Sequence, residues 1–308
     1  MAKVLVTGGG GFIGSNLVRG LLEQGDEVRV LDNFSTGNRE NLAGLDIEIV
    51  EGELRSYERV HNAVRGVELV YHLGALGSVP RSVQDPLTSS AVNVEGTLNV
   101  LLAARDEGIG RVVYSSSSSV YGSAGELPRT EAMAPDPISP YGVAKLAAER
   151  YCVSFSRVYD GFETVVLRYF NVFGPRQSPL SQYAAVVPLF VTAIAAGRPV
   201  TIFGDGEQSR DFTYVGNVVD ATIRAGAADG ASGRIFNVAA GTPGSVNLLA
   251  DTIGRILGRP VEKEYREPRP GDVRDSWADV SVAGEVFGYR PTVDLEEGLR
   301  RTIDFLRG

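Results

Sequence analysis

The sequence predicts an α/β fold: a doubly wound parallel sheet with a smaller α/β lobe toward the C-terminal end. Short β-branched runs alternate with longer segments whose apolar residues recur every three or four positions. A run of four glycines joins the first apolar run to the first helical segment, which is typical of such sheets. The 308 residues are enough to bury a sizeable core.

The alternation is regular in the first part of the chain. Each expected strand is rich in apolar, β-branched residues between turn residues, and each expected helix carries an apolar face. Strands are expected at 3–7, 27–32, 47–52, 68–75, 111–116 and 164–174. Helices are expected at 12–25, 56–66, 89–108 and 140–158.

After about residue 174 the pattern loosens. Helices are expected at 183–196, 216–228, 246–257 and 293–306, and short strands near 200–203, 234–238 and 261–265. We therefore expect two units. Residues 1–174, with later segments returning to them, form a cofactor-binding domain, and residues 175–308 form a smaller substrate-binding lobe over the carboxyl edge of the sheet.

Composition excludes several classes of function. The formal net charge of −8 argues against a nucleic-acid-binding protein. No apolar run approaches the roughly 20 residues of a membrane helix. A single cysteine, Cys152, fits a reducing compartment, so a cytoplasmic protein is expected. Two histidines without a Cys/His cluster predict no metal site, and His72, inside a strand pattern, is expected to be structural.

The glycine run predicts a dinucleotide-binding turn. Gly8, Gly11 and Gly14 lie between the first strand and the first helix, where a pyrophosphate can approach backbone amides at a helix N-terminus. The second strand ends at Asp32, 18 residues after Gly14. A carboxylate there accepts hydrogen bonds from both adenosine ribose hydroxyls and repels a 2′-phosphate, so NAD is expected rather than NADP.

A Tyr–Lys pair predicts acid–base chemistry. Tyr141 and Lys145 are four residues apart on an expected helix, so they share one face. A nearby ammonium, together with a positive nicotinamide, favours the phenolate and brings the pKa of the phenol toward neutral pH. The run of five serines at 115–119 lies 24 residues upstream of the tyrosine when counted from Ser117.

With these motifs in this order, the chain resembles the extended, nucleotide-sugar-modifying branch of the short-chain dehydrogenase/reductase superfamily. The resemblance covers essentially the whole chain, through TGGGGFIGSNL, LDNFSTG, HLGALGSVPRS, SSSSSVYG, SPYGVAK, LRYFNVFGPRQ, FGDGEQSRDFTYV and RPGDVRDSWAD. It implies a Rossmann-type sheet and bound NAD. It also implies that the serine run is ordered, and that Ser117 hydrogen-bonds the reacting sugar hydroxyl.

The residues after Ser117 bear on the reaction that the resemblance implies. Related sugar 4,6-dehydratases carry acidic residues there, and related UDP-glucuronate decarboxylases carry a Glu. This chain has Ser118 and Ser119. Without a carboxylate to protonate a leaving hydroxyl, the simplest chemistry is oxidation and re-reduction at one carbon, which is 4-epimerisation with the cofactor retained through the cycle.

Within that branch the chain is most similar to the UDP-N-acetylhexosamine (UDP-GlcNAc/UDP-GalNAc) 4-epimerases, through GALGSVPRS and NVFGPRQ followed by YAAVVP. Enzymes restricted to glucose and galactose tend to have Tyr where this chain has Ser276, and a small side chain leaves room for an acetamido group. Three alternatives stay open. They are a UDP-glucose/UDP-galactose 4-epimerase without N-acetyl preference, a UDP-glucuronate 4-epimerase in which Arg81 or Arg274 pairs with the carboxylate, and a non-catalytic NAD-binding sensor.

The resemblance assigns residues to three groups. The catalytic residues are Ser117, Tyr141 and Lys145. NAD is expected to contact Gly8, Gly11, Phe12, Ile13, Gly14, Asp32, Asn33, Ser35, Thr36, Gly37, Glu53, Leu54, Leu73, Gly74, Ala75, Asn93, Ser115, Tyr141, Lys145 and Tyr169. The UDP-sugar is expected to contact Gly77, Ser78, Val79, Ser117, Ser118, Ser119, Tyr141, Asn171, Gln177, Ala185, Val186, Val187, Thr201, Phe203, Arg210, Arg269, Asp272 and Ser276.

Several of these residues have more specific implied roles. Arg210 and Arg269 are expected to hold the diphosphate, because a guanidinium can bridge two phosphate oxygens. Asp272 corresponds to the acid that binds the uridine ribose, and Val187, Thr201 and Phe203 to the uracil site. The family's dimer elements correspond to the helices at 88–106 and 140–158, so a homodimer through a four-helix bundle is expected.

Overall fold

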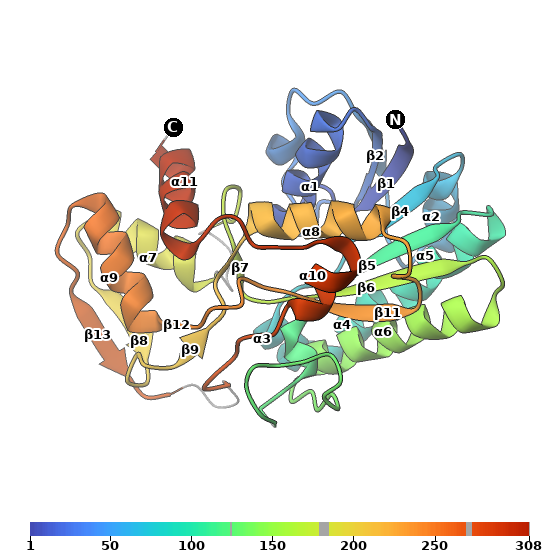
Figure 1. Cartoon of the computed structure of the whole chain (residues 1–308). Coiled ribbons are helices and arrows are strands. Elements are labelled where there is room, and N and C mark those ends of the chain that lie inside the picture. Colours follow the sequence, from blue (N-terminus) through green and yellow to red (C-terminus); the bar gives the residue numbers. More distant parts are fainter. Residues whose placement is uncertain (124, 179–184, 269–272, 308) are drawn as a thin grey trace.

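The computed structural model describes residues 1–123, 125–178, 185–268 and 273–307 (Figure 1). A seven-stranded sheet forms its centre, in the order β11-β6-β5-β4-β1-β2-β3, with every neighbouring pair parallel. The strands are β1 (Lys3–Thr7), β2 (Glu27–Asp32), β3 (Glu48–Glu51), β4 (Leu69–His72), β5 (Arg111–Ser117), β6 (Glu163–Tyr169) and β11 (Arg234–Val238). The strand order reverses between β1 and β4, and ligands of such sheets bind at the carboxyl ends of the strands at that point.

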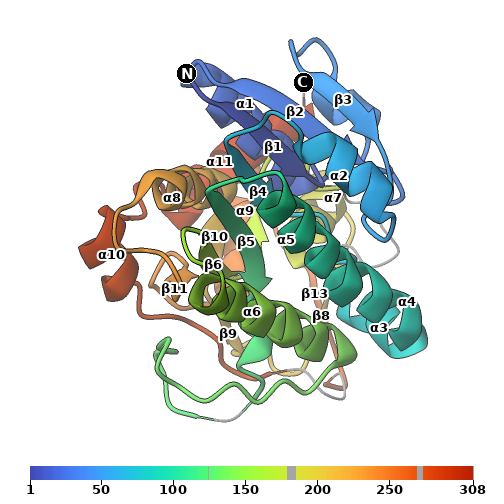
Figure 2. The same cartoon turned by 90° about the vertical axis from the view of Figure 1, so that its right-hand side faces the viewer.

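Helices cover both faces of the sheet, as Figure 2 shows, and the predicted fold class is confirmed. Val4 and Val6 face one hydrophobic cluster and Leu5 the other, because side chains alternate along a strand. The first face packs against α1 (Phe12–Glu23), α8 (Val215–Ala227) and α10 (Ser281–Phe287). The second face packs against α2 (Tyr57–Val64), α5 (Gly96–Asp106) and α6 (Pro140–Val158).

A smaller group of elements lies beside the sheet, at the left of Figure 1. It has its own hydrophobic cluster, built around Phe190, Ile202, Leu249 and Leu299. Its helices are α7 (Val186–Ala195), α9 (Val246–Leu257) and α11 (Leu295–Arg307). Its strand pairs are β8 (Val200–Phe203) with β13 (Lys263–Arg266), β9 (Ser209–Arg210) with β12 (Gly244–Ser245), and β7 (Val172–Phe173) with β10 (Thr213–Tyr214).

Short helices complete the chain. Two of them, α3 (Val79–Gln84) and α4 (Pro86–Ser90), lead into a π-helical segment, η2 (Ala91–Glu95), just before α5. The single helix expected at 89–108 is therefore three consecutive pieces. The 3-10 turns are η1 (Arg39–Leu42) and η3 (Ser118–Val120).

One further difference from the predicted elements concerns the route of the chain. The strand expected at 164–174 is wrong as one element, because the chain leaves the sheet after Tyr169 and Asn171 adopts a positive φ of 31°. Asn tolerates this conformation better than most residues. The short strand expected at 234–238 forms as β11, which lies beside β6 in the central sheet.

One buried carboxylate connects three segments at the junction of the two groups. Asp211 is fully buried, and its oxygens accept the backbone N–H groups of Ala240 (2.7 Å), Gly241 (3.0 Å) and Ala278 (3.2 Å). Burial raises the pKa of Asp211 to about 6, while these backbone hydrogen bonds act in the opposite direction. The contact with Ala278 fixes the segment that carries Ser276.

Candidate active site

The glycine turn leaves no room for side chains. Gly8 has a φ of +71° and its N–H donates to the Leu31 carbonyl, and the Gly11 N–H donates back to the Gly8 carbonyl. A Cβ on Gly14 would overlap that same carbonyl oxygen, and a Cβ on Gly37 would lie 2.8 Å from the Gly10 carbonyl carbon. The start of α1 is thus open to a phosphate group at close range, as a pyrophosphate requires.

Asp32 provides a receptor for a ribose beside this turn. It is only 8% exposed; its Oδ2 accepts the Gly10 N–H (2.8 Å) and its Oδ1 the Phe34 N–H (2.7 Å). Each carboxylate oxygen keeps a lone pair for a ribose hydroxyl. The chemistry of these donors and acceptors fits NAD, with Asp32 on the adenosine ribose and the Gly8–Gly14 turn on the pyrophosphate.

The remaining residues predicted for the cofactor lie on several elements of the central sheet and its helices. Asn33 donates to Glu53 (3.0 Å), and the pKa of Glu53 is lowered, chiefly by its hydrogen bond from Arg55. The Gly74 N–H donates to the Thr7 hydroxyl (3.0 Å). Asn93 is buried and bonded to the Leu76 backbone, and the Tyr169 hydroxyl bonds Thr222. Leu54 packs against Gly74. The others are Ser35 and Thr36, exposed in the loop after β2, Leu73 and Ala75 after β4, and half-buried Phe12 and Ile13 in α1.

His72 is structural, as expected. Its Nδ1 lies 2.7 Å from the Thr7 hydroxyl and its Nε2 3.0 Å from the Thr97 hydroxyl. Burial lowers the pKa of His72 to about 3, so the ring is neutral. The described residues contain no group of three His, Cys, Asp or Glu side chains able to hold a metal ion.

The structure brings the three predicted catalytic residues together at the N-terminal end of α6. Ser139 caps this helix by accepting the Gly142 N–H (3.1 Å), and Tyr141 follows in the first turn. A Cβ on Gly142 would lie 2.6 Å from the Ser119 carbonyl oxygen, so glycine allows the helix to approach the serine turn. The N–H of Tyr141 donates to the Ser82 hydroxyl (3.0 Å).

The serine run is ordered, as predicted. It forms the end of β5 and the start of the 3-10 turn η3. The Ser117 hydroxyl donates to the Ser119 hydroxyl (2.9 Å), accepts the Ser119 N–H (3.1 Å) and hydrogen-bonds the Tyr141 phenol. The Lys145 ammonium, 3% exposed, donates to the Ser115 carbonyl (2.8 Å).

Burial opposes ionisation of both acid–base groups. It raises the pKa of the Tyr141 phenol, and the hydrogen bond with Ser117 only partly offsets this. It lowers the pKa of Lys145 to about 8, although Cys152 and Glu149 act in the opposite direction. Burial therefore favours the neutral phenol of Tyr141, and a cation held close to it would favour the phenolate.

On the sugar side, the predicted residues other than Ser276 come from four separate segments. The Ser78 hydroxyl caps α3 by accepting the Arg81 N–H (3.2 Å), Val79 is exposed, and Gly77 faces open space. Ser118 is half-buried in η3. Asn171 and Ala185 are exposed, and Val186 is half-buried. Gln177 donates to the Val172 carbonyl (3.1 Å), and its Oε1 is buried with no hydrogen-bond partner among the described residues.

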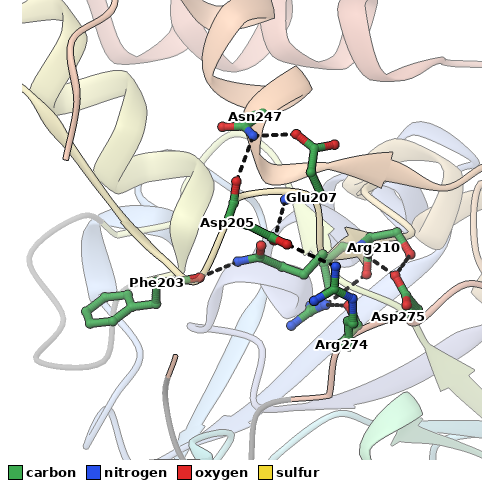
Figure 3. A network of polar contacts seen from close by, with 9 residues as sticks. Phe203, Asp205, Glu207, Arg210, Asn247, Arg274 and Asp275 are labelled. Atoms are coloured by element: carbon green, nitrogen blue, oxygen red, sulfur yellow. Dashed lines mark hydrogen bonds and ion pairs between the residues drawn. The ribbon is translucent and has the colours of Figure 1, made fainter. Parts of the chain in front are cut away.

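One of the predicted uridine residues, Phe203, borders a cavity of about 810 Å³. The Phe203 carbonyl accepts the Gln208 amide (2.7 Å), as Figure 3 shows. Tyr265 and Arg266 of β13 also line the cavity because β13 pairs with β8, the strand of Thr201. The Val187 side chain lies in the core of the smaller group, so it can meet a ligand only through its backbone.

The arginines expected near the diphosphate are differently placed. Arg210 donates to the Ser209 and Arg274 carbonyls (both 2.8 Å), next to the bridge that pairs Arg210 with Ser276. Arg274 is itself ion-paired with Asp205 at 3.0 Å (Figure 3). Arg269 and Asp272 lie outside the described residues.

Sequence reasoning missed several residues of the site. Ser82 supports the backbone of Tyr141, and Tyr265 and Arg266 line the cavity. Glu149 lies one helical turn beyond Lys145 and pairs with Arg168. The only signal in the sequence was the spacing of Tyr141, Lys145 and Glu149 by four residues, which places them on one helix face.

Replacement of Gly14 by Ala tests the glycine turn. The new Cβ would collide with the Gly8 carbonyl, a backbone atom that cannot move aside easily. We expect Gly14→Ala to lower the free energy of unfolding by about 1–3 kcal/mol. Its NAD content after gel filtration should fall about tenfold or more, measured by absorbance after acid release. Gly110→Ala is the matched control because its Cβ would meet open space; equal NAD content in both variants would contradict the assignment.

Comparison with known proteins agrees with this geometry. Residues 4–239 match the NAD dependent epimerase/dehydratase family. The chain is 41% identical over 315 residues to the UDP-glucose 4-epimerase of Mycolicibacterium smegmatis, covering 99% of this chain and 98% of that protein. None of the described helices is long and apolar enough to cross a membrane.

Two solved structures are closely similar. The UDP-glucose 4-epimerase of Thermotoga maritima with UDP-glucose superposes with a TM-score of 0.95 at 39% identity, over 99% of this chain and 98% of that one. The UDP-N-acetylglucosamine 4-epimerase of Methanobrevibacter ruminantium M1 with UDP-N-acetylmuramic acid gives 0.94 at 39% identity, with the same coverage. The predicted family resemblance is confirmed: the chain belongs to the NAD dependent epimerase/dehydratase family.

Proposed function

We propose that this protein is a UDP-sugar 4-epimerase with tightly bound NAD that interconverts UDP-GlcNAc and UDP-GalNAc, and also UDP-glucose and UDP-galactose. The observation that carries the proposal is the cluster of Ser117, Tyr141 and Lys145 at the carboxyl edge of the sheet. The two residues that follow Ser117 are serines, so no carboxylate adjoins it in the chain to expel a hydroxyl. The relatives named 4-epimerases support the same reaction.

The proposed mechanism gives each residue one task. NAD, when bound, supplies a hydride acceptor and donor for C4 of the sugar. Ser117 and Tyr141 hold the 4-hydroxyl, and Tyr141 accepts its proton as the ketone forms. After the keto sugar has turned to present its other face, the same phenol returns the proton. Lys145, fixed on the Ser115 carbonyl, provides the cation that favours the phenolate.

The proposed N-acetyl preference depends on Ser276. Its N–H donates to Ser209 and its carbonyl accepts the Asp211 N–H, so the segment is extended. Two residues on, Ala278 is buried in the same cluster as Val120 of the serine turn. Residues two apart in an extended segment share a side, so we expect the small side chain of Ser276 on the same side of the segment as Ala278, toward the serine turn.

UDP-glucose and UDP-galactose without N-acetyl preference are the second candidate substrates. The relatives from Mycolicibacterium smegmatis and Thermotoga maritima are named UDP-glucose 4-epimerases and favour this alternative. UDP-glucuronate is less well supported, because Asp205 already neutralises Arg274. Arg81 would remain as the cation for a carboxylate in that case.

We also infer a homodimer through helices α5 and α6. Exposed apolar side chains on α6, and on α3 and α4 ahead of α5, support this association, and we expect α6 and its neighbours to pair across a two-fold axis. Sedimentation equilibrium should give twice the chain mass of 32.9 kDa, and a monomer mass would contradict the inference. The exposed side chains on α3, α4 and α6 are Val79, Val83, Leu87, Val143, Tyr151 and Val158.

Incubation with each UDP-sugar and no added NAD tests the proposed reaction. The wild-type protein should convert UDP-GlcNAc to UDP-GalNAc, with the epimers separated by chromatography. Tyr141→Phe keeps the ring but removes the proton acceptor, so turnover should fall by about 100-fold or more with the unfolding temperature unchanged. Activity that depends on added NAD, or accumulation of NADH with product, would contradict the proposal, as would full activity of the variant.

Ser276→Tyr tests the N-acetyl preference separately. A phenol ring at this wall should clash with an acetamido group and leave smaller sugars unaffected. Overpacking of this kind costs about 1–3 kcal/mol, or roughly 5- to 150-fold in the ratio of specificity constants. Specificity constants for UDP-GalNAc and UDP-galactose should be measured for both proteins. An unchanged ratio would show that Ser276 does not select the sugar.

A further inference from the structure

A buried ion pair lies directly behind the catalytic residues. Glu149 of α6 is fully buried and Arg168 of β6 is 1% exposed. The pair is bidentate: Arg168 Nε donates to Glu149 Oε1 (2.9 Å), and one terminal nitrogen donates to Oε2 (2.7 Å). Neither residue belongs to the catalytic group assigned above, so the placement of two full charges in the core needs an explanation.

Removing two charges from water is expensive, and a well-packed apolar pair is often at least as stable. The other contacts of this pair are with residues at the two ends of the serine turn. The Ser116 hydroxyl donates to Glu149 Oε1 (2.5 Å), and the guanidinium of Arg168 lies 4.6 Å from the ring centre of Tyr121. Ser116 directly precedes Ser117, and Tyr121 directly follows the 3-10 turn η3. The pair therefore contacts both ends of the serine turn.

The same face of α6 meets the serine run three times. Tyr141 hydrogen-bonds the Ser117 hydroxyl, Lys145 donates to the Ser115 carbonyl, and Glu149 accepts from the Ser116 hydroxyl. These three α6 residues are spaced by four, one helical turn apart. A shift of α6 along β5 would break all three contacts together. Of the three α6 residues, Glu149 is the one that is ion-paired with a buried arginine.

Glu149 is also the carboxylate one helical turn from Lys145 on this face of α6, and it acts to raise the pKa of Lys145. Among the described residues, four other titratable side chains face or adjoin Lys145: two phenols, one thiol and one imidazole. Burial raises the pKa of the phenols and the thiol and lowers the pKa of the imidazole, so all four are neutral at pH 7. They are Tyr141 and Cys152 on α6, Tyr114 on β5, with the ammonium 4.9 Å from its ring centre, and His72 on β4.

We propose that Glu149 is a positioning residue of the reaction: anchored by Arg168, its carboxylate fixes the serine strand against α6 and keeps Lys145 an ammonium beside Tyr141. The catalytic roles of Lys145 and Tyr141 rest on the proposed function. The effect of the Glu149 carboxylate on the pKa of Lys145 and its effect on the position of α6 along β5 do not depend on the proposed function. Burial lowers the pKa of Lys145 to about 8 even with the Glu149 carboxylate acting in the opposite direction, so loss of the carboxylate should lower this pKa further.

The chain offers a direct measurement of the charge effect. It contains three lysines, Lys3, Lys145 and Lys263, so a protein labelled with 13Cε-lysine gives three signals that Lys3→Arg and Lys263→Arg assign. The titration of Lys145 can then be followed by NMR without any substrate. It reports on Glu149 even if the proposed reaction is wrong.

Glu149→Gln combined with Arg168→Met removes both charges and keeps an acceptor for Ser116, so the buried pair is replaced rather than broken. Lys145 should titrate about one pH unit lower, and the alkaline limb of kcat for UDP-GlcNAc should move by the same amount, with KM within about twofold. Arg150→Met, on the exposed side of α6, is the matched control and should change neither. A folded double variant with an unchanged Lys145 titration would overturn the charge role, and Glu149→Gln alone provides the same titration if the double variant is unstable.

Ser116→Ala tests the register role with the ion pair intact. Loss of this one hydroxyl should lower kcat about tenfold, leave KM within about twofold and leave the Lys145 titration in place. Ser156→Ala, which removes a hydroxyl bonded to the Val153 carbonyl farther along the same helix, is the matched control and should retain wild-type kcat. Wild-type kcat in Ser116→Ala would overturn the positioning role of the contact.

Discussion

The close contact between the first turns of α6 and the end of β5 is the constraint on which the site depends. Gly142 permits it, since any side chain there would press on the Ser119 carbonyl. Once the helix lies this close, a phenol, an ammonium and a carboxylate spaced by four residues each meet a different serine of the run. The relative positions of these groups therefore depend on how closely α6 packs against β5.

This contact lies beside a cofactor crevice that has its own constraint. The glycine turn excludes side chains, and Asp32 uses one lone pair of each oxygen on the backbone and keeps others for a ribose. The two features lie at the carboxyl ends of β1 and β5, the strands on either side of β4, so cofactor and sugar can share one edge of the sheet. Asp211 connects this edge to the smaller group of elements, because it binds backbone amides on both sides of the junction.

Most of the central fold could be predicted from the sequence because its signals are local. Apolar periodicity gives the strands and helices, and a spacing of four residues places Tyr141 and Lys145 together. The break at Asn171 could not be predicted, because the apolar pattern continues through it and only the backbone turn interrupts the strand. The Glu149–Arg168 pair was also hidden: charged residues usually indicate a solvated surface, and the two lie on different elements. Tyr265 reaches the cavity only through the pairing of β13 with β8, a long-range contact.

The return of β11 to the central sheet has a consequence for how such enzymes can be rebuilt. The smaller group is assembled from stretches on either side of residues 215–238, and those intervening residues supply α8 and the edge strand β11. A chimera made with a single splice after residue 174 would lose that helix and strand. The strand β6 would then be an unpaired edge of the sheet, and one face of the sheet would lose part of its helical cover. Transplanting a new sugar pocket onto this cofactor domain thus requires, besides the junction after residue 174, one junction before α8 and one after β11.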